Sequence, residues 1–319
     1  MPRLPENAEP DVSGARELLP HGVTVLERGW LSSNCVVLLG SSGGAVVDTG
    51  YATHAQQTLQ LVRSALSGLP LQIIVNTHLH SDHCGGNAIL QEAYPDARTA
   101  IPPGLAPSVA HWDPVALTHV PTGQICPRFD FQHLLEPGSI AELGNLRWEV
   151  HAAPGHDPNS VILFEPTSRI LLSADALWEH GFGVVFQELE GDAAFDEVAD
   201  TLDLIETLRP QVVVPGHGRV FTGAPAAIAR ARERLDGYRA DPRRHATHAA
   251  KVLLKFKLLE LQSALYEDFA AWALATPYFR LVRDRWFPQS DLHAWLEELC
   301  RGLVRSGAAS WEHGVICNR

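Results

Sequence analysis

Four side chains that can bind metal lie within six residues of one another in the segment NTHLHSDHCGGN (76–87). They are His78, His80, Asp82 and His83. Buried without partners, each unmet polar atom of such a group would cost about 1–3 kcal/mol. Histidines two positions apart can converge on one ion, and the Asp and His just beyond can reach a second. Imidazole and carboxylate are usual ligands of zinc and iron, so the segment predicts a site for one or two metal ions.

Three more candidate ligands occur downstream, each directly after an apolar, strand-like segment. His156 lies in APGHDPNS, Asp175 in LLSADAL and His217 in VVPGHG. The segment LQIIVNTH (71–78) likewise ends where the first histidines begin. Functional groups are commonly carried by the loop that follows a strand. We therefore expect these side chains to emerge at one edge of a sheet.

The segments that carry these residues alternate between strands and helices. NCVVLLGSSGGAVVDTG (34–50) is typical of a hairpin, and ATHAQQTLQLVRSAL (52–66) has helical spacing. Further strands are expected at 147–154, 160–166, 169–175 and 211–218, with helices near 86–94 and 194–208. This mixture indicates an α/β layered fold.

The composition restricts the class of protein. The chain has 319 residues, 45% of them hydrophobic and 19% charged, as in ordinary soluble globular proteins. Its five irregularly spaced cysteines include no CxxC, which favours a reducing compartment over a disulfide framework. We find no secretory signal and no run near the roughly 18 apolar residues of a membrane span. A cytoplasmic protein without membrane attachment is expected.

The charge is uneven along the chain. Residues 230–257 contain nine Lys/Arg and three acidic residues, a local charge of +6, which leaves −18 for the rest of a chain of net charge −12. A negative protein is not the default partner of nucleic acid, because phosphate contacts require a basic face. The basic stretch is either a solvated helix face or a surface that meets an anionic substrate.

The succession HLHSDH, GGN, PGH, SAD and PGHG resembles the metallo-β-lactamase superfamily of hydrolases over roughly residues 22–222. The resemblance implies an αββα sandwich with a two-metal centre at one edge of the paired sheets. It also implies which residues bind the ions: His78, His80 and His156 hold one metal, Asp82, His83 and His217 hold the second, and Asp175 bridges them. Two divalent transition-metal ions are expected, zinc first, with iron or manganese as alternatives.

Two neighbouring residues bear on the same resemblance. VVDTG matches a family segment, which makes Asp48 either a residue that supports a ligand or a turn residue at the end of a strand. After PGH, family members often carry a small hydroxyl residue, whereas this chain has Asp157. The ligand is retained, but the loop shape and the charge beside it are expected to differ.

Two metals bridged by one water produce a hydroxide near neutral pH and polarise the oxygen under attack. Asp82 can also orient or deprotonate that water, and it is the predicted catalytic residue. No Ser or Cys nucleophile is then needed, so Cys84 is expected to be a small apolar filler. The predicted reaction is hydrolysis of a small ester, thioester or lactone by a metal-bound hydroxide.

Substrate choice is expected to depend on two loops. Residues 101–137 are Pro-rich and irregular, which is typical of a lid or binding loop. Aromatic and histidine side chains in this loop and the next could wall an acyl pocket or pack the loops down: His111, Trp112, Phe129, Phe131, Trp178, Phe182 and Phe186.

From about residue 225 the pattern is helical, and a short hairpin is expected at 308–318. We divide the chain into a flexible N-terminus (1–20), a metallo-hydrolase domain (21–224) and a helical C-terminal domain (225–319). HATHAAKVLLKFKLLEL and LVRSGAASWEHGVI resemble the winged-helix tail of a subset of these hydrolases. Some tailed relatives cleave RNA, and others are thioester hydrolases of the glyoxalase II type.

The expected partner is a small-molecule acyl substrate, with neither nucleic acid nor membrane, and a homodimer is an assembly that the sequence leaves open. Two alternative functions also stay open. One is an endoribonuclease of the winged-helix-tailed type. The other is a binding or regulatory protein that keeps the fold with weak turnover. Iron-dependent sulfur oxidation is a further alternative.

Overall fold

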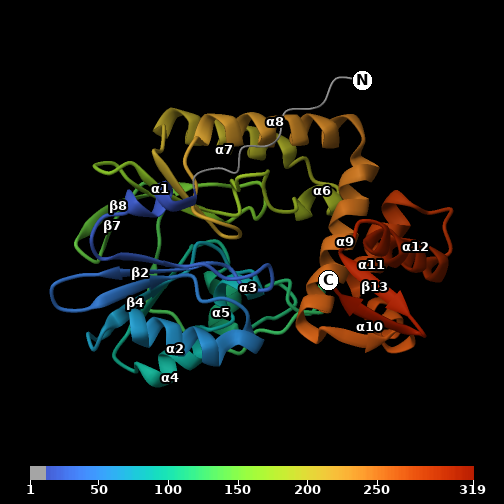
Figure 1. Cartoon of the computed structure of the whole chain (residues 1–319), viewed down its shortest axis with the longest axis horizontal. Helices are drawn as coiled ribbons and strands as arrows, with labels where there is room; N and C mark the ends of the chain where they lie inside the picture. Colours follow the sequence, from blue (N-terminus) through green and yellow to red (C-terminus); the bar gives the residue numbers. More distant parts are fainter. Residues whose placement is uncertain (1–11) are drawn as a thin grey trace.

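Two mixed β-sheets packed face to face form the centre of the molecule in the computed structural model, which describes residues 12–319 (Figure 1). The first sheet has the order β1-β2-β3-β4-β5-β6, with bounds Val23–Leu26, Cys35–Leu39, Gly44–Val47, Leu71–Val75, Arg98–Ile101 and His133–Leu134. The second has the order β11-β10-β9-β8-β7, with bounds Val212–Pro215, Ile170–Ala174, Val161–Glu165, Leu146–Ala152 and Ile140–Leu143.

The central strands are apolar and β-branched because both of their faces are covered. β2 and β3 form the predicted hairpin, with Val36 opposite Val47. β3, β4 and β5 run parallel, as do β10 and β11. Between the sheets, side chains from β2, β3 and β4 meet those of the second sheet, with the fully buried Trp148 among them. Burial on both faces accounts for continuous apolar runs in place of alternation.

Helices cover the outer face of each sheet, as Figure 1 shows. α2 (Ala55–Leu66) and α4 (Asn87–Ala93) pack on the first sheet, and α7 (Phe195–Leu208) and α8 (Ala224–Ala240) pack on the second. The arrangement is the αββα sandwich that the sequence predicts, so the fold prediction is confirmed. The shorter helices are α1 (Val12–Glu17), η1 (Ala52–His54), α3 (Ser81–Cys84), α5 (Ala106–His111) and α6 (Phe186–Glu190).

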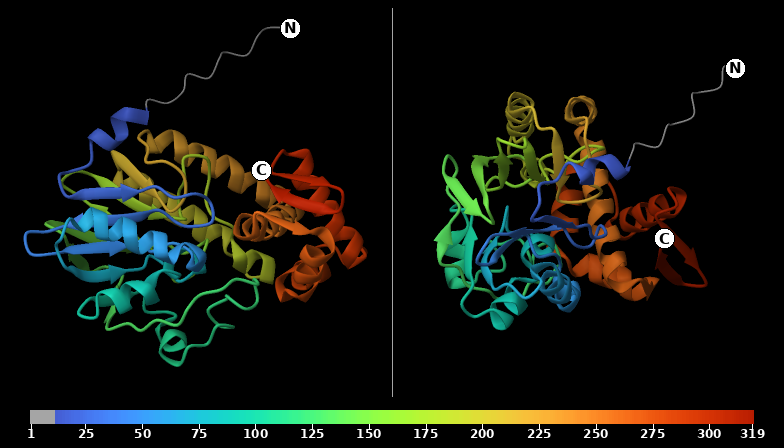
Figure 2. Two further views of the ribbon diagram at one scale, coloured as in Figure 1. Left: turned by 60° about the horizontal axis from the view of Figure 1, so that its bottom comes forward. Right: turned by 60° about the vertical axis from the view of Figure 1, so that its left-hand side comes forward.

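The C-terminal elements form a second, smaller unit at one end of the sandwich (Figures 1 and 2). They are α9 (Pro242–Leu261), β12 (Ser263–Leu265), α10 (Tyr266–Ala275), α11 (Pro277–Trp286), α12 (Leu292–Arg305), β13 (Ala309–Glu312) and β14 (Val315–Asn318). The three strands form a sheet of order β12-β14-β13. A helix, a strand, further helices and a terminal hairpin follow one another as expected of a winged-helix-like unit. The stripe Trp295, Leu299 and Leu303 is buried in its core.

The hydrophobic cores divide later in the chain than residue 225. Ile228, Leu235 and Tyr238 of α8 share a core with the second sheet and α7. The core of the C-terminal unit includes Ala246 of α9 and also Leu189 of α6. The sequence shows that both segments are helical, but the periodicity of a helix does not say which core its apolar face joins. Residues 1–11 of the predicted flexible N-terminus lie outside the described residues, and residues 12–17 form α1.

The Pro-rich segment 101–137 packs against the loop that carries the first histidines. Val109, Leu117 and Phe129 form a small buried cluster with Leu79 and Cys84. The segment contains α5 and, near its end, β6. It is therefore an ordered wall beside the histidine loop. Within residues 12–319, no helix is both long and apolar enough to span a membrane.

Candidate metal centre

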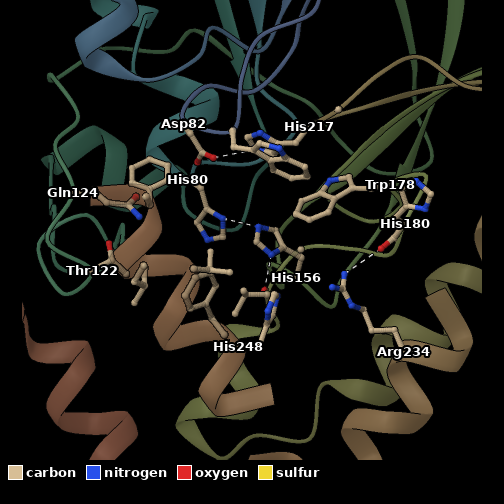
Figure 3. A pocket seen from close by; sticks show the side chains of 18 of the residues that line it. His80, Asp82, Thr122, Gln124, His156, Trp178, His180, His217, Arg234 and His248 are labelled. Atoms are coloured by element: carbon tan, nitrogen blue, oxygen red, sulfur yellow. Dashed lines mark hydrogen bonds and ion pairs between the residues drawn. The ribbon is translucent and has the colours of Figure 1, made fainter. Parts of the chain in front are cut away.

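Seven predicted ligands come together at one edge of the paired sheets. The loop after β4 carries His78 and His80, and α3, which follows it, carries Asp82 and His83. His156, Asp175 and His217 follow β8, β10 and β11. These strands all end at the same edge, which brings side chains more than a hundred residues apart into contact. Figure 3 shows His80, Asp82, His156 and His217 facing one another. The structure thus places every predicted ligand at the site.

Three imidazoles form the first cluster, which we call the His78 group (His78, His80 and His156). His80 Nδ1 lies 3.1 Å from His78 Nε2 and 2.8 Å from His156 Nε2. His156 Nδ1 donates to the Val184 carbonyl at 2.5 Å, so its Nε2 carries a lone pair when the ring is neutral. Thr77 Oγ1 lies 3.2 Å from His78 Nδ1 and can accept a hydrogen bond from its N–H. His80 cannot hydrogen-bond both neighbours from one nitrogen.

Burial keeps these three rings neutral. Burial lowers the pKa of His80 to about 4 and that of His156 to about 4. It also lowers the pKa of His78 well below its usual value, and the neighbouring histidines lower it further. Three neutral rings therefore turn nitrogen lone pairs toward one point. Lone pairs so close together repel one another unless a cation lies between them, so this cluster fits a metal ion.

Asp82, His83 and His217 form the second cluster, the His83 group. His83 Nδ1 donates to Asp48 Oδ2 at 2.8 Å, and the buried His83 Nε2 has no hydrogen-bond partner. Asp48 also accepts the backbone N–H of Thr77 at 2.9 Å and its hydroxyl at 2.8 Å. A ligand histidine typically donates its second N–H to such a carboxylate. The partnerless Nε2 is the atom that a metal would satisfy.

Asp175 lies between the two clusters. Its Oδ2 is 3.4 Å from His156 Nε2, 3.5 Å from His83 Nε2 and 3.8 Å from His217 Nε2. Trp178 Nε1 donates to the other oxygen, Oδ1, at 3.1 Å. Burial raises the pKa of Asp175, but His217 and His83 lower it more, so it is well below its usual value and the group is ionised. This position suits a bridging carboxylate.

The electrostatics of the His83 group complement this arrangement. Burial raises the pKa of Asp82, but the hydrogen bond from His217 at 3.1 Å and the charge of His83 outweigh it and lower the pKa overall. Burial lowers the pKa of His83, yet Asp175 and Asp48 raise it well above its usual value. The carboxylates therefore hold a positive charge here, either as protons on imidazole or as a metal ion.

Close packing leaves no room for a side chain at Gly216, in the motif PGHG. A Cβ there would lie 2.2 Å from Asp175 Oδ1 and 2.9 Å from His83 Cε1. The glycine lets the loop that carries His217 approach both clusters. The donor set as a whole is imidazole nitrogen and carboxylate oxygen, which suits zinc, iron and manganese alike.

A cavity of about 420 Å³ opens onto the site. His80, Asp82, His156 and His217 contribute to its floor, and Trp178 and Phe186 contribute to its walls. The other predicted aromatics serve packing. Phe182 belongs to the core under α7 and α8, Phe129 to the loop cluster, and Trp112 lies edge-on to Phe129 at 5.4 Å. Only part of the predicted aromatic wall therefore faces the cavity.

Several lining residues are missed by the sequence analysis. Trp30 stacks on His217, with ring centroids 5.6 Å apart and planes 9° apart, although it lies far from any motif. Val252, Leu253 and Phe256 of α9 form an apolar wall, and Arg234 and His248 lie nearby (Figure 3). The α9 residues have ordinary helical spacing, so no sequence signal separates them from core residues. Trp30, in a Gly-Trp loop, offers only the weak signal of an exposed aromatic.

Part of the basic stretch 230–257 is engaged in local ion pairs and hydrogen bonds. Arg232 pairs with Asp203 and Glu206 on α7 at 2.7 and 2.6 Å. Lys257 pairs with Glu260 at 3.0 Å, and Lys255 donates to carbonyls at the end of the chain. Arg234 differs, because it lines the cavity. The stretch therefore combines local pairing on the helix surface with a cation that lies beside the site.

Comparison with known proteins agrees with this geometry. A family model described as the metallo-beta-lactamase superfamily matches residues 28–217. The hydroxyacylglutathione hydrolase of Mesorhizobium japonicum is 26% identical over 166 residues, which are 50% of this chain and 51% of that protein. The chain spans about half the length of the curated relatives that it matches.

Two solved structures extend the comparison. TTHA1623, in a di-iron-bound form, is 26% identical with a TM-score of 0.53, over 66% of this chain and 98% of that one. A beta-lactamase domain protein from Burkholderia ambifaria has a TM-score of 0.59 at 20% identity, over 98% of this chain and 97% of that one. The second likeness shows that the fold is shared along nearly the whole chain, the C-terminal unit included.

Proposed function

The chain belongs to the metallo-β-lactamase superfamily, and we propose that it is a dinuclear-metal-dependent hydrolase of a small ester, thioester or lactone. One observation carries the proposal. Two clusters of candidate metal ligands lie on either side of Asp175, and two members of each cluster line a cavity of about 420 Å³. We expect zinc in both positions, with iron or manganese as alternatives that elemental analysis distinguishes.

When bound, two divalent cations activate a water molecule and polarise the oxygen of a carbonyl under attack. The side chains determine where this happens. Asp82 lines the cavity, and its Oδ2 accepts a hydrogen bond from His217 Nε2 at 3.1 Å. Asp82 is thus the carboxylate that can accept a proton from a water in the cavity. Trp178 holds Asp175 in place through its indole N–H at 3.1 Å.

The cavity walls favour an acyl substrate with an apolar part. Trp30 and Trp178 lie on one side, with ring centroids 5.2 Å apart. Phe186 lies on another side, where its ring is 5.4 Å from that of His80. Arg234 supplies a positive charge at the rim. Apolar walls with a few polar groups are typical of small-molecule sites.

The described surface gives less support to the ribonuclease alternative. The arginines of α12 that would approach phosphates are already paired with carboxylates: Arg301 with Glu297 and Arg305 with Glu298, each at 2.6 Å. Paired arginines release fewer counterions when phosphates bind. We therefore keep a small acyl compound as the proposed substrate.

The test is a substrate panel assayed with metal-loaded protein. Esters, thioesters, lactones and a phosphodiester are compared before chelation, after chelation and after metal is restored. We expect turnover of a carbonyl compound that is lost with the metal and recovered with it. No turnover of any carbonyl substrate by protein carrying two metal equivalents would contradict the proposal.

The catalytic assignment needs its own variant. Asp82→Asn should lower kcat about 10²–10⁴-fold, the range of general acid–base catalysis. Asp203→Asn, which changes an exposed aspartate on α7, is the matched control and should leave kcat unchanged. Detection of an acyl group covalently bound to a side chain would show that the reaction runs through a different nucleophile.

A further inference from the structure

Two thiols lie in contact beside the metal centre. Cys84 Sγ is 3.7 Å from Cys126 Sγ. Cys84 ends α3, directly after His83, and Cys126 lies in the Pro-rich loop, 42 residues further along the chain. Neither residue takes part in the proposed hydrolysis. If Cys84 only filled space in the core, a second sulfur in contact with it would not be needed.

The two cysteines differ in accessibility and in freedom to move. Cys84 is fully buried, and Cys126 is partly exposed. The turn after Cys84 is fixed, since a Cβ on Gly85 would lie 2.4 Å from the Ala52 nitrogen and 2.6 Å from the Ser81 carbonyl oxygen. Residues 124–131 belong to neither a helix nor a strand. The side of the pair that can move is therefore the loop.

The geometry points to a redox modification site, in which Cys84 and Cys126 form a disulfide when the protein meets a peroxide. The sulfur–sulfur distance must shorten from 3.7 Å to about 2.05 Å. A small approach of the Cys126 segment supplies this change, with the buried Cys84 as the fixed partner. The link would join the loop to the helix that carries Asp82 and His83.

The chemistry balances with hydrogen peroxide as the oxidant. The exposed Cys126 sulfur, as thiolate, attacks one peroxide oxygen and displaces hydroxide, which gives a sulfenic acid. The Cys84 sulfur then attacks the sulfenic sulfur and loses its proton, and the hydroxyl group leaves as water. In total, two thiols and one hydrogen peroxide give one disulfide and two waters.

A disulfide between Cys84 and Cys126 would alter the cavity through Gln124. Ser81 Oγ donates to Gln124 Oε1 at 2.5 Å, and Gln124 and Thr122 line the cavity on the side away from Arg234 (Figure 3). Ile125 N donates to the Tyr51 hydroxyl at 3.2 Å. Drawing Cys126 toward α3 shifts a segment held by these bonds. If the proposed hydrolase activity is correct, KM should change about two- to tenfold, as for one altered hydrogen bond.

The alternative to a disulfide is a metal ion bound between the two cysteines and a neighbouring histidine. One ring nitrogen of the buried His119 lies within 4.8 Å of both sulfurs, so the three side chains could hold a soft metal. His119 Nε2 lies 3.1 Å from the Leu79 carbonyl, and the buried Nδ1 of the same ring has no partner. Cys84 Sγ, which donates to the His80 carbonyl at 3.3 Å, would lose its proton on binding a metal and on forming a disulfide alike. The metal content of the protein therefore distinguishes the two outcomes.

The test uses the metal-loaded protein, reduced and then treated with hydrogen peroxide. After unfolding, the free thiols should fall from five to three. Trypsin should then release residues 64–98 linked to residues 99–128, because cleavage after Arg98 separates the two cysteines. These measurements need no substrate, so their outcome does not depend on whether the proposed hydrolase activity is correct.

Variants make the outcome specific. Cys126→Ser and Cys84→Ala should keep the activity of the reduced protein, retain their remaining thiols after peroxide and show no peroxide-dependent change in KM. Cys317→Ser, in β14, is the matched control and should still lose two thiols. Five persistent thiols, a different cysteine pair or Cys126 oxidised to sulfinic acid beside a free Cys84 would overturn the proposal. So would a third equivalent of bound zinc that Cys126→Ser removes.

Discussion

Replacing Asp48 by Asn tests how the site holds His83 without touching a metal ligand. Asp48 has a φ of 57°, in the left-handed region that Asn tolerates. Asn is also almost the same size as Asp, so the backbone and the packing should be kept. The change therefore acts on the hydrogen bonds of Asp48 and on the negative charge beside His83.

The magnitude follows from three bonds. The amide oxygen of Asn can still accept the Thr77 N–H, which Asp48 Oδ1 accepts at 2.9 Å. The amide NH₂ cannot accept the His83 Nδ1–H that Oδ2 accepts at 2.8 Å. The Thr77 hydroxyl donates to the same Oδ2 at 2.8 Å, but it can rotate and accept a hydrogen bond from the NH₂ instead. Loss of one hydrogen bond to a charged group costs about 1.5–3 kcal/mol of unfolding free energy. His83 would then favour the tautomer with a proton on Nε2, the atom intended for metal.

Metal affinity should fall about 10–100-fold, the usual effect of removing the partner of a ligand histidine. The larger loss should occur in the His83 group, because His83 belongs to it. Competition with a chromophoric chelator measures the affinity, and urea unfolding of the metal-free protein measures the stability. Retention of both metals at the original affinity would refute the reasoning.

Glu165→Gln provides the control for a general loss of stability. Glu165 is also buried, and it accepts the backbone N–H groups of Thr167 and Ser168 at 3.1 and 2.6 Å. It lies on β9, and its bonds hold a turn and no ligand. This variant should lose stability yet bind both metals as before. Equal metal loss in both variants would mean that Asp48 acts only through the fold.

Three further outcomes are expected. Asp175→Ala should lower the occupancy of both metal positions together, because Asp175 Oδ2 is within 3.8 Å of ligands from both groups; elemental analysis showing two full equivalents would contradict bridging. Burial lowers the pKa of His245 to about 3. Below a pH of about 6.5, His245 is therefore protonated in the unfolded state but stays neutral in the folded state. Stability is then lost as pH falls from about 6.5 toward 3. Urea unfolding at pH 7 and pH 5 should show that His245→Gln removes about 2 kcal/mol of this loss of unfolding free energy. If the variant loses as much stability between these two pH values as the unchanged protein, the prediction is wrong. Single-stranded RNA should bind more weakly than about 10 μM at physiological salt, whereas tight, salt-sensitive binding lost on mutating Arg243 and Arg244 would favour the nuclease.

Local pattern carried much of the fold prediction. The hairpin at 34–50 and the helix at 194–208 were recognisable because their apolar spacing repeats within a few residues. The core that the apolar face of α8 joins could not be predicted in this way. Its apolar face packs on the second sheet, and that choice depends on where the preceding strand ends and on the space left beside α7.

The candidate ligands were determined by the sequence, because a metal-binding loop needs particular side chains at particular spacings after a strand. His78 through His83 carry that information locally, and His156, Asp175 and His217 repeat it at three later strand ends. Only the tertiary structure decided what surrounds them. Trp30, Phe256 and Cys126 reach the site from separate parts of the chain, through packing that no local spacing records. The cavity and the thiol pair arise because the sandwich, the Pro-rich loop and α9 meet at one edge, and such contacts depend on how whole elements pack.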